Sequence, residues 1–297
     1  MAVLRKLWIL VPVCLLVLAP AALAGPPRIT AVDYPGAVFT AAFGINPAGD
    51  IVGGYSIDGS DEHGFLLRHG TFSPYDYPGA AWTEFEAITP QGDILGEYGL
   101  TDYTVHGFIL RDGAPYPIDV LGQPSDKGLP NTMPVHISPE GTVVGCYHQS
   151  DADGNVYLET MYGYVMKPDG GVESFDMEAS MHNGVNAAGD IVGIYYNEDG
   201  IVPQSYLIHN GKVSWFSFPG SLVTQAWDIS PTGAIVGFHR NAAGIHGFVL
   251  ARGEWTSFDV PGSTLTKAFG INAGGDVVGY YYDANGVHGF LRSRQGR

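Results

Sequence analysis

Cysteine is scarce in this sequence, with two residues among 297. Cys14 lies in an N-terminal segment with the features of an export signal, which leaves Cys146 as the one cysteine in the rest of the chain. A single thiol excludes an internal disulfide framework, although exported proteins often have one. The folded protein must therefore owe its stability to packing.

Basic residues are also few: 14 Lys and Arg stand against 30 Asp and Glu, which gives a formal net charge of −16. So acidic a surface disfavours nucleic acid and anionic lipid, and it favours cations, basic partners or neutral sugars. Beyond the first residues, no apolar run is long enough to span a membrane. The sequence thus predicts neither nucleic-acid binding nor membrane insertion.

The apolar run that does exist is short and lies at the N-terminus. Two basic residues precede the stretch from Leu7 to Leu18, and a small-residue cleavage site ends at Ala24. This order is typical of a secretory signal peptide. We expect residues 1–24 to be removed, which changes the net charge to −18, and residues 25–297 to form one domain that is secreted to the periplasm or outside the cell.

Established catalytic motifs are absent too. The sequence contains no glycine-rich phosphate loop, no HExxH, no GxSxG and no strong zinc-binding spacing. The motifs therefore leave open whether the protein is an enzyme.

The feature present in abundance is a repeat, whose six copies begin 43, 49, 48, 44 and 42 residues apart. The copies are GINPAGDIVGGY from Gly44, AITPQGDILGEY from Ala87, HISPEGTVVGCY from His136, GVNAAGDIVGIY from Gly184, DISPTGAIVGFH from Asp228 and GINAGGDVVGYY from Gly270. Repeats of this length are typical of propellers and solenoids, and each unit offers four short apolar segments separated by turn residues. The sequence predicts an all-β fold, a six-bladed β-propeller with four-stranded blades.

The two ends of the chain are predicted to share one blade. The last unit stops after HGFLRSRQGR without a fourth strand, whereas an orphan segment, ITAVDYPG, begins near the N-terminus. Two-residue turns fix the register of the outer hairpins, so that His63 should face Asp76. By the same register, an N-terminal strand that completes the C-terminal blade places Asp33 opposite His288 and removes free sheet edges.

The motifs HGFL, GIN, GDIVG and D-x-PG resemble those of a bacterial extracellular repeat, the HAF family. The resemblance covers almost all of the chain after the signal segment. It implies secretion and a repeated structure, but no reaction, so no catalytic residue is carried over from it.

Two positions in the innermost predicted strand differ between the repeats. Because consecutive strand residues face opposite sides, the first position of one blade is predicted to face the second position of the next. This pairs Glu86 with His136 and Asn183 with Asp228. These pairs are either structural hydrogen bonds between blades or a polar site in the channel that includes His182.

The third repeat has the longest predicted loops, residues 121–134 and 148–161, which should rise from one face. Long loops on a rigid scaffold often bind ligands. The second loop is rich in oxygen ligands, which suits either a solvated acidic turn or a calcium site. The predicted ligand-binding residues are His148, Asp151, Asp153 and Asn155, and the predicted calcium ligands are Asp151, Asp153, Asn155 and Glu159.

These observations favour a secreted binding or interaction module that presents the loops of the third repeat to a carbohydrate or a protein. The alternative is a lyase or hydrolase that cleaves polysaccharides or esters in the central channel, with Glu86, His136 and His182 as candidate catalytic residues. Propellers host both classes, so the fold alone does not choose between them. Apart from calcium we predict no cofactor, and we expect a monomer.

Overall fold

The structure, a computed structural model, describes residues 27–120, 128–151, 153–196 and 203–294. The predicted signal peptide, residues 1–24, lies outside the described residues, as do residues 121–127 of the first long loop. All regular secondary structure in the described ranges is β-strand. That part of the chain contains no helix with the length and apolar character needed to cross a membrane.

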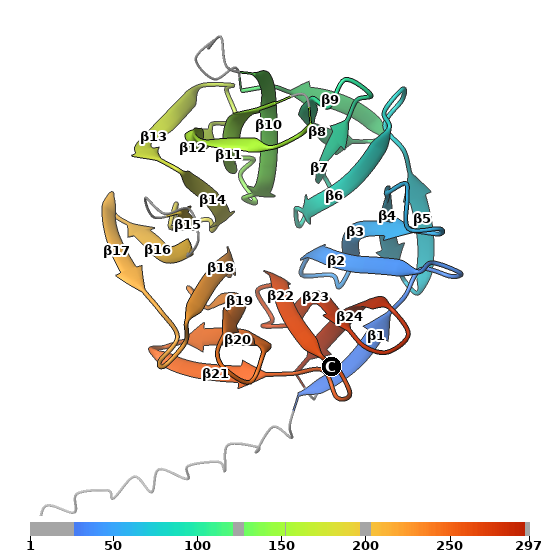
Figure 1. Ribbon diagram of the computed structural model, residues 1–297, viewed down its shortest axis with the longest axis vertical. Helices are drawn as coiled ribbons and strands as arrows, with labels where there is room; N and C mark the ends of the chain where they lie inside the picture. The colour runs from blue at the N-terminus through green and yellow to red at the C-terminus, as the bar shows by residue number, and fades with distance from the viewer. Residues whose placement is uncertain (1–26, 121–127, 152, 197–202, 295–297) are drawn as a thin grey trace, which may run out of the picture.

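The strands recur along the chain in the order inner, second, third and outer (Figure 1). The inner strands are β2 (Phe39–Ile45), β6 (Trp82–Ile88), β10 (Leu129–Ile137), β14 (Ser180–Val185), β18 (Val223–Ile229) and β22 (Leu265–Ile271). The second strands are β3 (Ile51–Ser56), β7 (Ile94–Gly99), β11 (Val143–Ser150), β15 (Ile191–Tyr196), β19 (Ile235–Arg240) and β23 (Val277–Tyr282). The third strands are β4 (His63–Arg68), β8 (Val105–Arg111), β12 (Val156–Met166), β16 (Pro203–His209), β20 (Ile245–Ala251) and β24 (Val287–Ser293). The outer strands are β5 (Thr71–Tyr75), β9 (Ala114–Ile118), β13 (Val172–Glu178), β17 (Lys212–Phe216), β21 (Glu254–Phe258) and β1 (Arg28–Val32).

Hydrogen bonds join these strands into sheets that surround a common axis, as in a propeller (Figure 1). Four sheets have four strands each: β6–β9, β10–β13, β14–β17 and β18–β21. The other eight strands form one sheet, in which β2–β5 and β22–β24 with β1 meet at a single parallel bridge between Phe39 and Val287. The all-β propeller arrangement of four-stranded blades is confirmed, but hydrogen bonding separates four such blades and not the six predicted. The first residues of β2 and β24 form a backbone bridge. This bridge joins the remaining two groups of four strands into one sheet.

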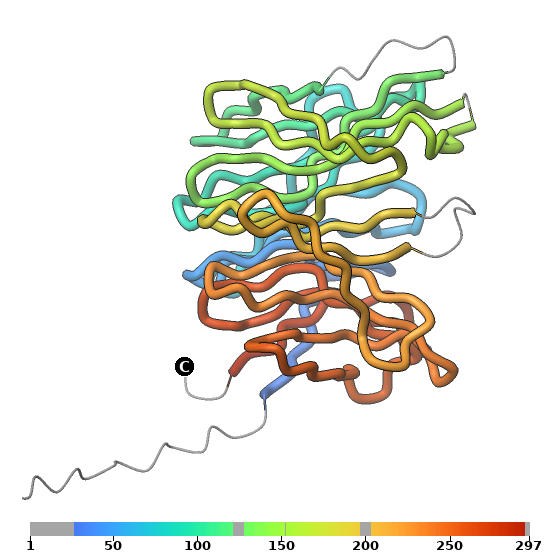
Figure 2. The backbone as a smooth tube through the Cα atoms, turned by 90° about the vertical axis from the view of Figure 1, so that its left-hand side faces the viewer, coloured from blue at the N-terminus to red at the C-terminus, as the bar shows by residue number. Residues whose placement is uncertain are grey.

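The N-terminal strand β1 completes the sheet that ends with β24, as predicted. The two strands pair antiparallel, from Arg28 opposite Ser293 to Val32 opposite Gly289. Figure 2 shows β1 running beside the last strands at one end of the molecule. His288 Nδ1 lies 3.0 Å from Asp33 Oδ1, which confirms the predicted contact between the two ends of the chain.

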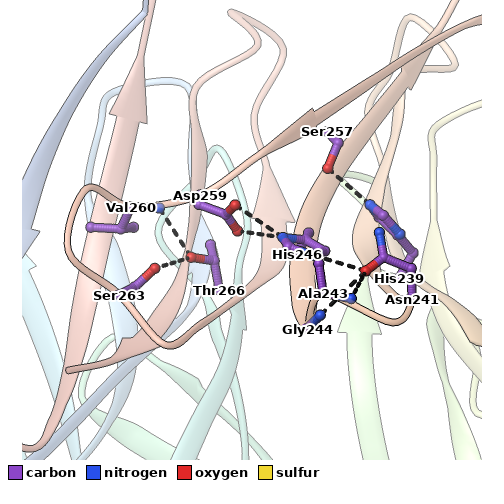
Figure 3. Close-up of polar contacts among 10 residues, drawn as sticks. All are labelled: His239, Asn241, Ala243, Gly244, His246, Ser257, Asp259, Val260, Ser263 and Thr266. Atoms are coloured by element: carbon purple, nitrogen blue, oxygen red, sulfur yellow. Dashed lines mark hydrogen bonds and ion pairs between the residues drawn. The ribbon is translucent and has the colours of Figure 1, made fainter.

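Contacts between histidine and aspartate recur across the outer hairpins. His63 Nδ1 lies 2.7 Å from Asp76 Oδ1, as the hairpin register predicts. Further pairs are His106 with Asp119 and His246 with Asp259, each at 2.9 Å. Figure 3 shows the pair of His246 and Asp259. Exposed pairs of this kind contribute about 0.2–1 kcal/mol each. The recurring histidines therefore belong to the structural frame.

The core lies between neighbouring sheets. Phe85 and Ile88 of β6, for example, pack against Val52 of β3. The third strand of each four-stranded unit holds a fully buried aromatic residue. These residues are Phe65, Phe108, Tyr164, Tyr206, Phe248 and Phe290. Burying a side chain of this size contributes about 1.5–3 kcal/mol, so packing can stabilise a chain whose Cys146 is a buried free thiol.

Candidate functional site

The inner strands share a β-bulge at the same place. In β2 the register with β3 shifts between Ala42 and Gly44, which leaves Phe43 unpaired. The unpaired residues of the inner strands are Phe43, Glu86, Val135, Asn183, Trp227 and Phe269. A bulge changes the direction of nearby side chains. The strict alternation of faces, on which the predicted pairing between blades rested, therefore fails here.

The predicted contact between Glu86 and His136 is wrong for this reason. His136 Nε2 instead lies 3.2 Å from Asp228 Oδ1. Asn183, which was predicted to pair with Asp228, donates from Nδ2 to the carbonyl oxygen of Ala226 at 2.8 Å.

The contact between His136 and Asp228 joins β10 to β18, two inner strands that are not neighbours, and so passes in front of β14. Asp228 is 3% exposed, and its carboxylate accepts hydrogen bonds from the main-chain N–H groups of Ile229 and Ile271, at 2.6 and 2.8 Å. Burial raises the pKa of Asp228, while His136 and these N–H groups act in the opposite direction. The pair is a structural contact between inner strands, in which His136 Nδ1 stays buried without a hydrogen-bond partner among the described residues.

Gly184 of β14 makes this contact possible. A Cβ at Gly184 would lie 2.7 Å from the Cα of Asp228, too close for two carbon atoms. We expect Gly184→Ala to push β14 away from β18 and to lower the free energy of unfolding by about 1–3 kcal/mol. Denaturant unfolding measures this loss, and an unchanged midpoint would contradict the close approach.

A cavity of about 560 Å³ occupies the mouth of the channel. Its lining includes Phe39 and Val223, the first residues of two inner strands, and Glu97 and Tyr280 from the second halves of second strands. Inner strands begin and second strands end on the same face of the ring. The cavity therefore opens on the face where the chain enters β10 and leaves β11.

Aromatic side chains form one part of the cavity wall. The Phe269 ring centroid lies 4.6 Å from that of Trp227, 5.3 Å from that of Phe43 and 5.2 Å from that of Tyr280. Such rings offer an apolar surface of fixed shape to a ligand.

Three glutamates form another part of the wall. Glu84 and Glu86 come from β6, and Glu84 stands directly opposite Glu97 of β7. One carboxyl oxygen of each lies within 4.8 Å of the others. Gly54 of β3 leaves the space they need, because a Cβ there would lie 2.9 Å from Glu84 Oε1. We call Glu84, Glu86 and Glu97 the carboxyl cluster.

The pKa of every member of the carboxyl cluster is raised, and burial is the largest cause for each. The charge of Glu62 adds to it and raises the pKa of Glu97 to about 8. A hydrogen bond with Glu62 adds to the rise for Glu84, and the charge of Glu97 adds to it for Glu86. At neutral pH Glu97 therefore holds a proton that a bound cation would displace.

Lys267 lies against the aromatic part of the wall. Its Nζ is 4.7 Å from the ring centroid of Phe238 and 5.4 Å from that of Tyr280, which are cation–π contacts. Burial lowers the pKa of Lys267. The cavity thus combines an acidic cluster, a partly buried ammonium group and aromatic rings.

The carboxyl cluster also has the composition of a cation site. Within the described ranges it is the one group of three His, Cys, Asp or Glu side chains whose ligand atoms approach within 4.8 Å of one another. Carboxylate oxygens suit Ca²⁺ and Mg²⁺. A divalent cation is therefore one candidate occupant of this part of the cavity.

The other predicted histidines lie outside the channel cavity. His182 is 1% exposed, and its Nδ1 lies 2.7 Å from the hydroxyl oxygen of Tyr206. Burial lowers the pKa of His182 to about 3. His148 lines a second cavity between two blades. The structure therefore does not bring Glu86, His136 and His182 together as a catalytic group.

The acidic loop forms a turn closed by its own hydrogen bonds. Asp151 Oδ1 accepts from the N–H groups of Asp153 and Asn155, at 2.9 and 2.8 Å, and Oδ2 accepts from Asn155 Nδ2 at 2.8 Å. This is an Asx turn, and it uses the carboxylate that calcium would need. Asp153, Asn155 and Glu159 are exposed. Calcium binding in this loop stays a prediction.

Sequence reasoning found Glu86 but missed Glu84, Glu97 and Lys267. A signal for Glu97 existed, because the same repeat position otherwise holds uncharged residues: Gly54, Cys146, Ile194, Phe238 and Tyr280. Glu84 and Lys267 lie two residues before the bulge of their strands, and the bulge decides which way they face. The change of register at the bulge does not alter the spacing of the repeat, so it cannot be predicted from that spacing.

Known proteins match this chain in fold and not in sequence. No family model matches it, and a comparison with curated proteins gave no match either. Virginiamycin B lyase from Staphylococcus aureus superposes with a TM-score of 0.52 at 11% identity, over 90% of this chain and 99% of the lyase chain. A gluconolactonase from Xanthomonas campestris gives 0.51 at 13% identity, over 91% and 96% of the two chains. A variant of the Aleuria aurantia lectin in complex with Fucα1-6GlcNAc gives 0.52 at 10% identity, over 86% and 93%. At such identities the likeness shows the propeller fold alone.

Proposed function

We propose that this protein is a carbohydrate-binding propeller whose main site is the channel cavity and whose ligand carries an amino group. The observation that carries the proposal is the carboxyl cluster beside an aromatic wall in one cavity. Carboxylates bind ammonium groups through charge-assisted hydrogen bonds, and aromatic rings pack against the apolar face of a sugar ring. A cavity of about 560 Å³ lies in the usual range for small ligands.

The loops of the third repeat belong to this proposal. The described ends of these loops, next to β10 and β11, lie on the face where the cavity opens, so the loops would contact the remainder of a longer carbohydrate or a protein that carries it. The Aleuria aurantia lectin, which holds a disaccharide on a fold of this kind, supports a carbohydrate as the ligand class.

The proposal extends to the architecture and to export. The eight-stranded sheet divides at the single bridge between Phe39 and Val287 into two four-stranded units, and these units with the four separate blades make the six blades proposed here. We also propose membership of the HAF repeat family, and secretion after removal of residues 1–24, on the motifs of the sequence.

Two ligands that differ in one group test the proposed function. We expect 2-aminoethyl glucoside to bind at least about tenfold more tightly than 2-hydroxyethyl glucoside near pH 7, because only the amine gains the carboxyl cluster. Titration calorimetry of the native chain measures the difference, and Glu84→Gln should reduce it. The matched control is Glu254→Gln on the exposed part of β21. Equal affinities for the two glucosides would contradict the proposal.

An enzyme remains the second candidate function, and one observation favours it. With a pKa of about 8, Glu97 is protonated at neutral pH, and its carboxyl oxygen lies within 4.8 Å of carboxyl oxygens of Glu84 and Glu86. A protonated acid beside a second carboxyl group is the arrangement that hydrolyses glycosides with retention. Turnover of a nitrophenyl glycoside that Glu97→Gln abolishes would establish this function, whereas binding without turnover supports the binding module.

A further inference from the structure

A second cavity, of about 500 Å³, lies where the β6–β9 blade meets the β10–β13 blade. Its lining includes Trp82, Tyr103 and Thr104 of the following turn, Asn131, His148 and Ser150. In this acidic protein, none of the described residues that line it is Asp, Glu, Lys or Arg. Its lining therefore suits an uncharged ligand.

His148 is the polar group of this cavity that the fold leaves without a partner. It is 5% exposed, and within the described ranges Nδ1 is enclosed without a hydrogen-bond partner. Its polar neighbours satisfy each other, since Asn131 Nδ2 donates to Ser150 Oγ at 2.9 Å. His148 lines the cavity, and its Nδ1 is the ring nitrogen that is buried without a partner. Burial lowers the pKa of His148 to about 4, so the ring is neutral at pH 7.

Two aromatic side chains line the same space. Tyr103 is 62% exposed, and its φ of 67° lies in the left-handed region, which costs energy for a residue with a large side chain. Trp82 packs over Gly99, where a Cβ would lie 2.0 Å from Trp82 Nε1. An exposed ring held at a strained position contributes little to the core, which points to a contact outside the fold.

We propose that this cavity is a second binding site, and that it takes a neutral carbohydrate. Trp82 and Tyr103 would contact the apolar face of a sugar ring, and His148 Nε2 would exchange a hydrogen bond with a sugar hydroxyl. The uncharged lining distinguishes this site from the channel cavity, which has the carboxyl cluster. The inference does not rest on the function proposed for that cavity.

Saturation-transfer NMR with methyl glycosides of glucose, galactose, mannose and fucose tests the second site, with glucosamine and glucuronic acid as charged counterparts. At least one neutral methyl glycoside should receive saturation at millimolar concentration. Tyr103→Gly removes the ring and relieves the positive φ, so it should keep the native melting temperature and weaken binding at least about tenfold. His148→Leu should weaken binding as well.

A variant outside both cavities serves as the control. Glu254→Gln, on the exposed part of β21, should leave neutral glycoside binding unchanged. Native affinity in folded Tyr103→Gly would overturn the proposal, whatever His148→Leu does to folding. The absence of any bound neutral glycoside, or binding of charged sugars alone, would also overturn it.

Discussion

Glu97→Gln is expected to raise the stability of the protein at pH 8, on the order of several kcal/mol. Burial raises the pKa of Glu97 to about 8, above the value of about 4.3 in an unfolded chain. The folded state therefore binds a proton that the unfolded chain releases. The stability from this proton is complete below about pH 4.3 and is lost as the pH rises through 8. Glutamine stays uncharged at every pH. The variant therefore keeps the stability that the native chain loses as the pH rises.

Calorimetric melting temperatures between about pH 5 and pH 9 measure this effect. The native chain should lose stability across the range, and Glu97→Gln should lose much less of it. Glu254→Gln makes the same chemical change on an exposed stretch of β21, and it should follow the native curve. If Glu97→Gln runs parallel to the native chain, burial does not raise the pKa of Glu97 as described.

A chain that begins at Tyr34, and so lacks β1, is expected to lose at least about 10 °C in melting temperature or to aggregate. The deletion exposes the edge of β24 and removes the paired segment that ends at Val32 opposite Gly289, as well as the buried side chain of Val32. Melting curves and size-exclusion chromatography measure the two effects. A synthetic peptide of residues 25–35 should restore the melting temperature by pairing with β24.

Asp33→Asn is the matched control for this deletion. It keeps the strand pairing and alters only the exposed contact with His288, so it should cost less than about 1 kcal/mol. A deletion no more harmful than Asp33→Asn would show that strand β1 does not close the ring.

The fold could be predicted from local rules that the repeat supplies many times over. A two-residue turn such as His69-Gly70 fixes the hairpin register, and so the pairing of His63 with Asp76 follows from counting. Closure through β1 followed because one unit lacked an outer strand. The merging of eight strands into one sheet did not follow, since it depends on a single contact between Phe39 and Val287.

The site was less predictable, because it depends on a β-bulge. A bulge adds one residue to a strand without changing the length of the repeat, so the faces of Glu86 and His136 could not be read from alternation. The opposition of Glu84 and Glu97 needs the register of β6 and β7 on the far side of that bulge. Glu86 and Glu97 are each the one charged residue at their repeat position, whereas the place of Glu84 beside them follows only from the register of the folded sheet.

The most direct test of the proposed carbohydrate site is a proton count on binding. Titration of the native chain with 2-aminoethyl glucoside near pH 7, in two buffers of different ionisation enthalpy, gives the number of protons exchanged. Because an ammonium group favours the ionised carboxyl cluster, we predict a release of about one proton per ligand, and a smaller release in Glu97→Gln. Binding without proton release, or no binding of the amine at all, would contradict the account.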